Sequence, residues 1–401
     1  MPARLVQVMG LFERQILSDL DQLERQALLR KLRTIESGHG PRVVYQGRNM
    51  VMLSSNNYLG LASHSAIKDA AIAAIRRYGT GTGASRLIAG NLKPLSDLEA
   101  RLAQFKGAEA ALVFGSGYLA NLGTIPALAG AQDVILSDEL NHASLIDGCR
   151  LARAQVMVYR HRDCDHLKTM LTAARGARRR IIVTDSVFSM DGDVAPLADI
   201  VELARRYQAA VMIDEAHALG MLGPKGAGLA SALGLEREID IQMGTLSKAI
   251  GGYGAYVAGS RALIDLLINR ARSFIFTTGL PPASVAVASA AIDLIESEPE
   301  RIRRLWDNGC YLRSGLTAAG FRLGDSVTPI LPVIIGQAQP ALDLAEALLR
   351  RNIFVLAIRP PTVPEGTARL RVTPTAEHTH ADLDEALAAF IASGREAGLI
   401  A

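Results

Sequence analysis

Residues 243–252 read MGTLSKAIGG, and this segment decides the fold prediction because it places a lysine directly after a short apolar run. The hydroxyls of Thr245 and Ser247 precede Lys248, and a glycine pair follows it. A lone lysine after a strand is usually solvated, whereas a lysine among polar groups at the ligand edge of a sheet can form a Schiff base. The segment therefore predicts a strand that ends at either a covalent-catalysis lysine or a solvated one.

Short apolar runs on both sides of this segment alternate with amphipathic stretches. The runs cover residues 51–53, 110–114, 134–136, 156–159, 181–184, 209–213, 241–243 and 256–258. Helix-like segments between them include residues 94–106 and 197–207. Such alternation predicts an α/β domain, in which helices cover both faces of a mostly parallel sheet.

The two ends of the chain show different patterns of apolar residues from the middle. Apolar residues recur at spacings of three and four over residues 5–36, which predicts an N-terminal helix. After residue 282 the pattern predicts a smaller α+β domain, with helices over 283–297, 298–319, 340–351 and beyond Thr379, and strands over 330–335, 354–358 and 370–373. The expected divisions are a helical arm at 1–50, a large cofactor-binding α/β domain at 51–285 and a small C-terminal domain at 286–401.

The composition excludes several classes of protein. The chain has 401 residues, of which 49% are hydrophobic and 21% charged, so it is not a disordered protein. The net charge of +3 and the absence of basic stretches interleaved with aromatics argue against a nucleic-acid partner. The three cysteines, an odd number, lack metal-type spacing and predict a reducing compartment.

A membrane location is also not expected. Glu13 and Arg14 interrupt any apolar core of a signal peptide. Residues 110–132 carry no charge, but they contain glycines, a proline and polar residues, which predicts a strand, a turn and a helix rather than a bilayer span. We therefore expect a cytoplasmic protein without a metal.

Two further motifs follow predicted strands. Residues 115–120, GSGYLA, match the loose dinucleotide-binding fingerprint, although an ordinary glycine-rich turn explains a lone match equally well. Residues 214–217, DEAH, spell a helicase-type box, but the chain has no Gly-Lys dipeptide and hence no phosphate loop. What remains is an acid at the carboxyl end of a strand with a histidine three positions later, or simply a capping acid and a surface histidine.

Together the motifs match the needs of pyridoxal phosphate. This cofactor requires a covalent lysine, an acid at its ring nitrogen, phosphate ligands and preferably a flat group over its ring. Lys248, Asp214 and His142 supply the lysine, the acid and the flat group, while the turn at Gly117 and Tyr118 and the Thr245 hydroxyl supply the phosphate contacts. The alternative assignment, an NAD-dependent oxidoreductase, would depend on the motif at residues 115–120 alone.

The sequence resembles the α-oxoamine synthases, fold-type-I pyridoxal-phosphate enzymes that condense an amino acid with an acyl-CoA and release carbon dioxide. The matching segments cover nearly the whole chain: residues 54–60 (SSNNYLG), 141–144 (NHAS), 187–192 (VFSMDG), 214–217 (DEAH), 244–248 (GTLSK), 276–282 (FTTGLPP) and 370–374 (LRVTP).

The resemblance implies a role for each cofactor residue. Lys248 binds the cofactor covalently and later moves the substrate's α-proton, and Asp214 binds the pyridine nitrogen. His217 and Ser189 hydrogen-bond the phenolic oxygen. His142 stacks on the ring, with a helix cap as the alternative interpretation. The remaining expected contacts are Gly117, Tyr118 and Thr245 at the phosphate or ring edge, and Thr277 and Thr278 at the phosphate of a neighbouring subunit in a homodimer.

The resemblance also implies substrate contacts. Arg371, helped by Asn56, is expected to bind the amino acid's carboxylate, with Arg369 as its rival. The expected acyl-substrate contacts are Arg30, Arg359 and Thr362, although a solvated helix charge is an alternative for Arg30.

One stretch bears on the choice of substrate. Residues 359–364, RPPTVP, favour the biotin-synthesis branch, which joins L-alanine to a pimeloyl thioester carried by CoA or a carrier protein. Residues 85–86 and 371–375 also resemble relatives such as aminolevulinate synthase, 2-amino-3-ketobutyrate CoA ligase and sphingoid-base synthases. A glycine-using condensation with acetyl- or succinyl-CoA therefore remains the alternative.

Overall fold

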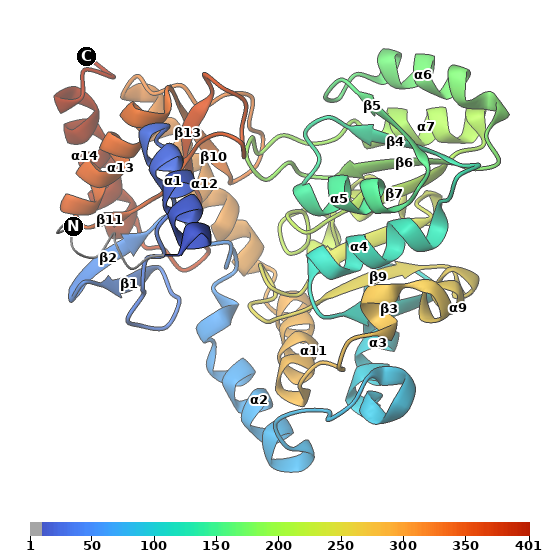
Figure 1. The fold of residues 1–401 in the computed structure, drawn as a ribbon. Coiled ribbons are helices and arrows are strands. Elements are labelled where there is room, and N and C mark those ends of the chain that lie inside the picture. Colours follow the sequence, from blue (N-terminus) through green and yellow to red (C-terminus); the bar gives the residue numbers. More distant parts are fainter. Residues whose placement is uncertain (1–9) are drawn as a thin grey trace.

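A seven-stranded sheet forms the centre of the computed structural model, which describes residues 10–401 (Figure 1). Its strand order is β3-β9-β8-β7-β6-β4-β5. The strands are β3 (Ala110–Phe114), β4 (Val134–Asp138), β5 (Gln155–Tyr159), β6 (Arg180–Asp185), β7 (Ala210–Asp214), β8 (Ile241–Thr245) and β9 (Ala255–Gly259). Only β9 runs antiparallel to its neighbours within this sheet. The predicted mostly parallel sheet is confirmed.

Helices cover both faces of this sheet. One apolar cluster packs against α3 (Lys93–Phe105), α6 (Cys164–Ala173), α7 (Leu197–Tyr207) and α11 (Pro282–Ser297). A second packs against α4 (Gly117–Leu128), α5 (Ala143–Leu151), α9 (Arg261–Arg270) and α10 (Arg272–Ile275). The central strands are buried throughout, as expected for parallel strands covered on both sides.

Two three-stranded sheets form the rest of the molecule. One has the order β1 (Arg42–Tyr45), β2 (Arg48–Met52), β11 (Ile353–Phe354), and the other β10 (Leu331–Gly336), β13 (Ala368–Val372), β12 (Ala357–Ile358). The helices α12 (Glu300–Ala318), α13 (Ala338–Arg350) and α14 (His380–Glu396) pack with them around a third apolar cluster. Figure 1 shows these sheets with α13 and α14 on one side and the seven-stranded sheet on the other.

The remaining elements are short or peripheral. They are α1 (Leu11–Arg25), α2 (Ser65–Tyr78), α8 (Leu229–Ala232), a π-helical turn at Arg86–Gly90, and 3₁₀ turns at Leu61–Ser63, Ala174–Gly176, Pro224–Gly226 and Glu236–Glu238. Residues 110–132 contain β3 and α4, as predicted. Among residues 10–401, none of the helices has the length and apolar character needed to cross a bilayer.

Three predictions about the elements are wrong in detail. The apolar run at 51–53 begins inside β2, which pairs with β11 from the far end of the chain rather than with the large sheet. The run at 354–358 divides into β11 and β12, which lie in different sheets. The predicted boundary between residues 285 and 286 falls inside α11, whose apolar face belongs to the core of the large sheet.

The N-terminal helix is much shorter than predicted. Of the expected range 5–36, residues 5–9 lie outside the described chain, and α1 ends at Arg25. Ala27 adopts a left-handed φ of 55°, and the amides of Leu28 and Leu29 both bond to the carbonyl of Leu23. The helix ends there because Arg359 binds the carbonyls of Ala27 and Leu29, a tertiary contact that periodicity does not reveal.

Candidate active site

The carboxyl ends of the central strands bring the predicted catalytic residues together. Strand β7 ends at Asp214, and the turn after β8 carries Lys248. Burial lowers the pKa values of both Lys248 and His142, and the nearby carboxylate of Asp214 opposes this effect in each case. Burial also lowers the pKa of His217, and the charges of Lys248 and His142 add to that effect. Ligands of open α/β sheets bind at this edge, so the four residues form one site.

Asp214 is buried, with 3% of its surface exposed. Its Oδ2 accepts a hydrogen bond of 2.9 Å from Nδ2 of Asn121, and its Oδ1 accepts one of 2.9 Å from the amide of Ala216. A buried carboxylate needs such partners, because an unpaired buried charge is very costly. Asn121 was not among the predicted site residues, although an asparagine inside the uncharged segment 110–132 was an available signal.

Lys248 is partly buried and faces two carboxylates. Burial lowers the pKa of Lys248, although Asp214 and Asp185 act in the opposite direction. Within residues 10–401 no hydrogen bond engages its Nζ. A lowered pKa increases the neutral fraction of the amine, and the neutral amine is the nucleophile that forms a Schiff base.

His217 is held through a tyrosine that the sequence analysis did not single out. The hydroxyl of Tyr58 lies 2.6 Å from Nδ1 of His217 and accepts a hydrogen bond of 3.0 Å from Nη2 of Arg371. The single proton of this hydroxyl has two acceptors within reach, Oδ1 of Asn56 at 3.2 Å and Nδ1 of His217 at 2.6 Å, and the contact with His217 is the shorter. With the proton on the His217 side, the histidine carries its own proton on Nε2. Burial places the pKa of His217 well below its usual value, so this ring is neutral.

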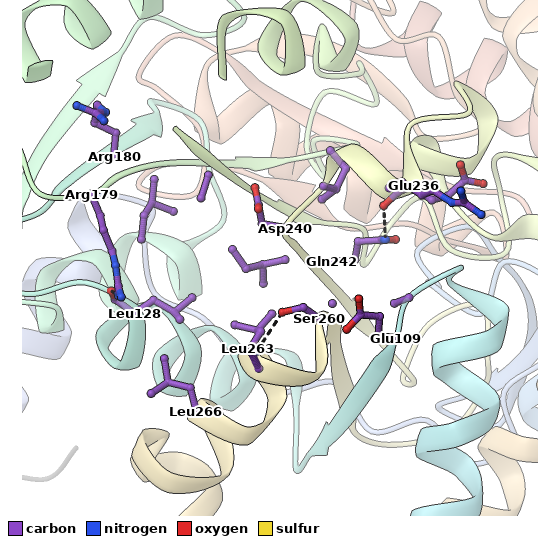
Figure 2. Close-up of a pocket in the computed structure, with 18 of the residues that line it drawn as sticks. Glu109, Leu128, Arg179, Arg180, Glu236, Asp240, Gln242, Ser260, Leu263 and Leu266 are labelled. Carbon is purple, nitrogen blue, oxygen red and sulfur yellow. Dashed lines mark hydrogen bonds between the residues drawn. The ribbon is translucent and has the colours of Figure 1, made fainter. Parts of the chain in front are cut away.

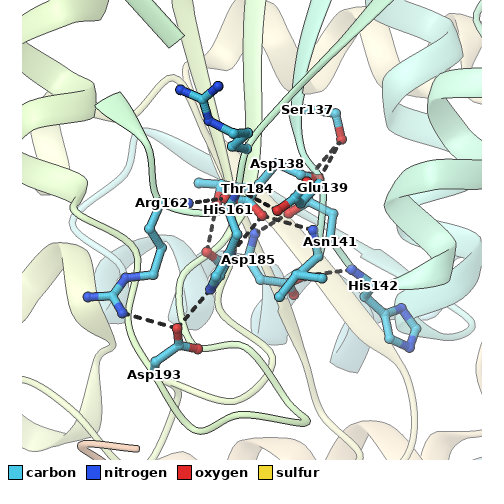
Figure 3. Close-up of polar contacts among 12 residues, drawn as sticks. Ser137, Asp138, Glu139, Asn141, His142, His161, Arg162, Thr184, Asp185 and Asp193 are labelled. Carbon is cyan, nitrogen blue, oxygen red and sulfur yellow. Dashed lines mark hydrogen bonds and ion pairs between the residues drawn. The ribbon is translucent and has the colours of Figure 1, made fainter. Parts of the chain in front are cut away.

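His142 occupies the N-cap of α5. Its Nδ1 accepts a hydrogen bond of 3.2 Å from the amide of Ser144, which confirms the cap interpretation without excluding ring stacking. Its own amide donates to Oδ2 of Asp185 at 2.7 Å (Figure 3). Burial lowers the pKa of His142, with Asp214 opposing this effect and Lys248 adding to it. The stacking role remains a prediction.

A polar network supports the loop that presents His142 (Figure 3). Asn141 donates to the carbonyl of Val183 at 2.8 Å and accepts from the amide of Asp185 at 2.9 Å. His161 bridges Asp138 and Asp193 at 2.9 and 2.8 Å. Burial acts to lower the pKa of His161, but these two carboxylates raise it to about 9, so the bridge is ionic at neutral pH.

The N-terminus of α4 lies beside Thr245, as a phosphate site requires. A Cβ added to Gly117 would lie 3.2 Å from the Met243 side chain and 3.9 Å from Thr245, so glycine allows this close approach. Ser116 caps the helix by accepting from the amide of Leu119 at 3.2 Å. Free amides at a helix N-terminus bind anions. The Tyr118 hydroxyl donates to Asp147 at 2.5 Å.

Thr277 and Thr278 are not brought to this cluster by the chain itself. Thr278 forms an isolated bridge with Ser85, and across residues 10–401 no hydrogen bond joins either threonine to Lys248 or its neighbours. Their predicted contact with the phosphate of a neighbouring subunit therefore stays a prediction.

The two arginines of β13 differ in a way that decides between them. Arg369 forms an ion pair with Asp191 and donates to the carbonyl of Met190. Arg371 is 7% exposed and donates only to uncharged groups: Oδ1 of Asn56 at 2.9 Å, the Tyr58 hydroxyl and the carbonyl of Ser189. In the described chain Arg371 thus has no carboxylate partner, which favours it for binding a substrate carboxylate.

The predicted acyl contacts lie around two connected features. A cavity of about 450 Å³ is lined by residues that include Asn141, Phe188, Ser189 and Thr362. Arg359 donates a hydrogen bond to the carbonyl of Leu29 at 2.9 Å. The positive charge of the exposed Arg30 also acts on Arg359 electrostatically. Arg359 is therefore already engaged with the backbone, and Arg30 is the freer cation of the two.

A larger cavity of about 940 Å³ lies at the opposite edge of the sheet (Figure 2). Its lining includes Arg180, Ala210 and Ile241, which begin strands β6, β7 and β8. None of the predicted site residues lines it, so volume alone does not identify the active site. No cluster of three or more potential metal ligands occurs among residues 10–401.

Comparisons with known proteins agree with this geometry. The family model "Aminotransferase class I and II" matches residues 48–390. An 8-amino-7-oxononanoate synthase of Geobacter sulfurreducens is 52% identical over 96% of this chain and 100% of its own, and one of Symbiobacterium thermophilum is 50% identical over 96% and 98%. A serine palmitoyltransferase structure from S. paucimobilis, with a bound PLP–myriocin aldimine, matches 98% of this chain and 100% of its own at 33% identity and a TM-score of 0.92.

The chain therefore belongs to the α-oxoamine synthases, the fold-type-I pyridoxal-phosphate enzymes within the class I and II aminotransferase family. Within that family, its curated relatives at about half identity are named 8-amino-7-oxononanoate synthase.

The link between Arg371 and His217 leads to a first prediction. In Tyr58→Phe, both residues lose a hydrogen-bond partner, and His217 is free to exchange tautomers. We expect pyridoxal-phosphate affinity, measured by absorbance titration, to fall by about 3- to 10-fold, because a buried hydrogen bond contributes about 0.5–1.5 kcal/mol. Tyr256→Phe is the matched control, since that buried hydroxyl has no partner among the described residues. Equal affinity in both variants would contradict the link.

Proposed function

We propose that the protein catalyses the pyridoxal-phosphate-dependent condensation of L-alanine with a pimeloyl thioester, with loss of carbon dioxide, to give 8-amino-7-oxononanoate for biotin synthesis. The observation that carries this proposal is the full-length identity of 52% to a synthase of that name, combined with a site whose lysine, buried acid and histidines are all present. The glycine-using reaction is the alternative within the family.

The residues present fit the cofactor. The buried carboxylate of Asp214 accepts hydrogen bonds at both oxygens and would hold the ring nitrogen, and a neutral His217 would offer its Nε2 proton to an oxygen. Gly117, at a helix N-terminus, lets the backbone pass close to Met243 and Thr245, and the amides of this turn would hold a phosphate. When bound, pyridoxal phosphate supplies an electron sink that stabilises negative charge on the substrate's α-carbon.

The chain's own groups then have distinct tasks. Lys248 would hold the cofactor through its Nζ and, when that nitrogen is free, would accept the substrate's α-proton and later return one. Arg371 holds the amino acid's carboxylate in its planar fork while Asn56 and Tyr58 keep the guanidinium in place. Ser189 and Asn141, the residue before His142, line the cavity of about 450 Å³, which would receive the acyl chain.

The lysine's covalent role gives the second prediction. In Lys248→Ala, condensation should fall by at least about 10²–10⁴-fold, the usual contribution of a general acid–base group. The cofactor should still bind through its phosphate and ring contacts, but borohydride should no longer attach it to the protein. Lys225→Ala is the control, because Lys225 is exposed and pairs with Glu296 at 3.5 Å, far along the chain. CoA release by Lys248→Ala at the rate of this control would refute the role.

The preference for a dicarboxylic acyl chain is inferred from Arg30 and Arg359, which lie near each other although they are far apart in sequence. Arg30 is exposed and has no carboxylate partner within residues 10–401, and burial together with the charge of Arg30 lowers the pKa of Arg359. Two neighbouring guanidinium groups repel each other unless an anion lies between or beside them. The far carboxylate of a pimeloyl chain is an anion of the right kind, whereas an acetyl group has none.

A third prediction follows for substrate choice. In Arg30→Ala, kcat/KM for pimeloyl-CoA should fall by about tenfold or more, while that for acetyl-CoA stays within about twofold, because only the first substrate loses a charge-assisted contact. Arg25→Ala is the control, because in the part of the chain that the structure describes this α1 side chain bonds to the carbonyl of Asp21 alone. Alanine should also outperform glycine, although one methyl group accounts for only about 1–3 kcal/mol of discrimination. A wild-type preference for glycine with acetyl- or succinyl-CoA would reject the biotin assignment.

We further propose a homodimer with the site at its interface. Helix α1 exposes the large apolar side chains of Leu11, Phe12, Ile16, Leu17, Leu20 and Leu23. Such an exposed apolar face favours a protein partner, and a second copy would also bring its Thr277 and Thr278 to the phosphate. Sedimentation at assay concentration should give about twice the chain mass of 42.8 kDa, whereas a fully active monomer would contradict the proposal.

A reducing cytoplasm is the location we infer. Cys149, Cys164 and Cys310 are all free. Burial raises the pKa of Cys149 to about 11, so this thiol is unreactive near neutral pH and has a packing role.

A further inference from the structure

Asn121 connects two parts of the active site that come from different strands. This residue lies on α4 with 0% of its surface exposed. Its Nδ2 lies 2.9 Å from Oδ2 of Asp214 and also 2.9 Å from Oγ of Ser144. Ser144 in turn lies 2.7 Å, through the same Oγ, from Nδ1 of His142. These contacts form a continuous hydrogen-bonded path from the carboxylate of Asp214 to the imidazole of His142.

The chemistry of the Asp214 carboxylate fixes the direction of every hydrogen bond along this path. An ionised carboxylate can only accept, so Asn121 must turn its NH₂ group to Asp214. The second proton of that NH₂ group then points to Ser144, and Oδ1 of Asn121 has no partner within residues 10–401. The hydrogen bond to Asp214 therefore sets the orientation of the Asn121 side chain, because this orientation leaves the side chain's own acceptor, Oδ1, without a hydrogen bond.

Ser144 continues the same direction of hydrogen-bond donation to His142. Because Oγ of Ser144 already accepts from Asn121, its single proton is available for Nδ1 of His142. The amide of Ser144 approaches the same nitrogen at 3.2 Å. Two donors at Nδ1 require an unprotonated nitrogen there, so the proton of His142 is on Nε2. The charged or titratable groups facing this ring are Asp214, Lys248, Asp185 and His217.

We propose that Asn121 and Ser144 are positioning residues that carry the hydrogen-bond direction set by the carboxylate of Asp214 to His142, holding it as a neutral imidazole with its proton on Nε2. The cofactor ring would then meet a fixed, uncharged ring on one face and an ionised acid at its nitrogen. Only this consequence rests on the proposed function. The tautomer itself is a property of the chain.

The test measures the tautomer directly. Full-length protein with ¹⁵N-labelled histidine is examined by NMR with and without pyridoxal phosphate, and the His142 signals are assigned from their loss in His142→Gln. The variants are Ser144→Ala, which removes the hydroxyl, and Asn121→Leu, which removes the link to Asp214. Ser144→Thr restores a hydroxyl. Thr124→Val is the matched control, because Thr124 lies one turn further along α4 and its buried hydroxyl has no partner among the described residues.

We expect wild type, Ser144→Thr and Thr124→Val to show a single His142 tautomer with an unprotonated Nδ1. Ser144→Ala and Asn121→Leu should show both tautomers and bind the cofactor at least about tenfold more weakly. The relay is overturned if Ser144→Ala, the milder change, keeps the single wild-type tautomer and the affinity of the control. A tautomer change in cofactor-free protein supports the relay even if alanine proves not to be the substrate.

Discussion

The buried charge of Asp214 is the constraint on which the site depends. A carboxylate at the end of a central strand, almost without solvent, is tolerated only when neighbouring groups compensate for its lost hydration. Strand β7 brings it there, and the amide of Ala216 and the side chain of Asn121 provide the compensation. The packing of α4 against the sheet is thus tied to the site, because α4 carries the asparagine that donates a hydrogen bond to Asp214.

The next residue, Glu215, anchors the same segment from the other side. Its carboxylate is 0% exposed, pairs with the ammonium of Lys106 and accepts from the amide of Ala230 at 3.0 Å. Gly228 passes so close that an added Cβ would lie 2.5 Å from this carboxylate. Consecutive acids with opposite directions and separate partners explain how the segment remains rigid while Asp214 retains a charge that binding requires.

The same burial selects the protonation states of the other groups. Removing water penalises every charged form, so both histidines have lowered pKa values, whereas the pKa of Asp185 is raised well above its usual value, first by burial and then by Asp214. A neutral imidazole can accept through one nitrogen and donate through the other, which is why each histidine can be oriented by a hydroxyl.

The sequence predicts those parts of the molecule that depend on local patterns. Strand β3 and helix α7 match their predicted bounds because apolar periodicity and flanking turns are local signals. The pairing of β2 with β11, some 300 residues apart, has no local signal, and neither does the end of α1 at Arg25. The site residues on strand ends followed from motif and family, whereas Tyr58 and Asn121 act on other side chains, so only the folded arrangement reveals their roles.

This difference between local and distant determinants also bears on specificity. The cofactor residues project from the ends of strands in a rigid sheet, which suits a chemistry shared by a whole family. The region expected to bind the acyl chain is built differently. Arg359 donates hydrogen bonds to the carbonyls of Ala27 and Leu29, and the loop that follows Arg359 lines the cavity of about 450 Å³. The position of Arg30 therefore depends on a contact between the two ends of the chain, and a substitution at either end can change the acyl preference without touching the catalytic centre.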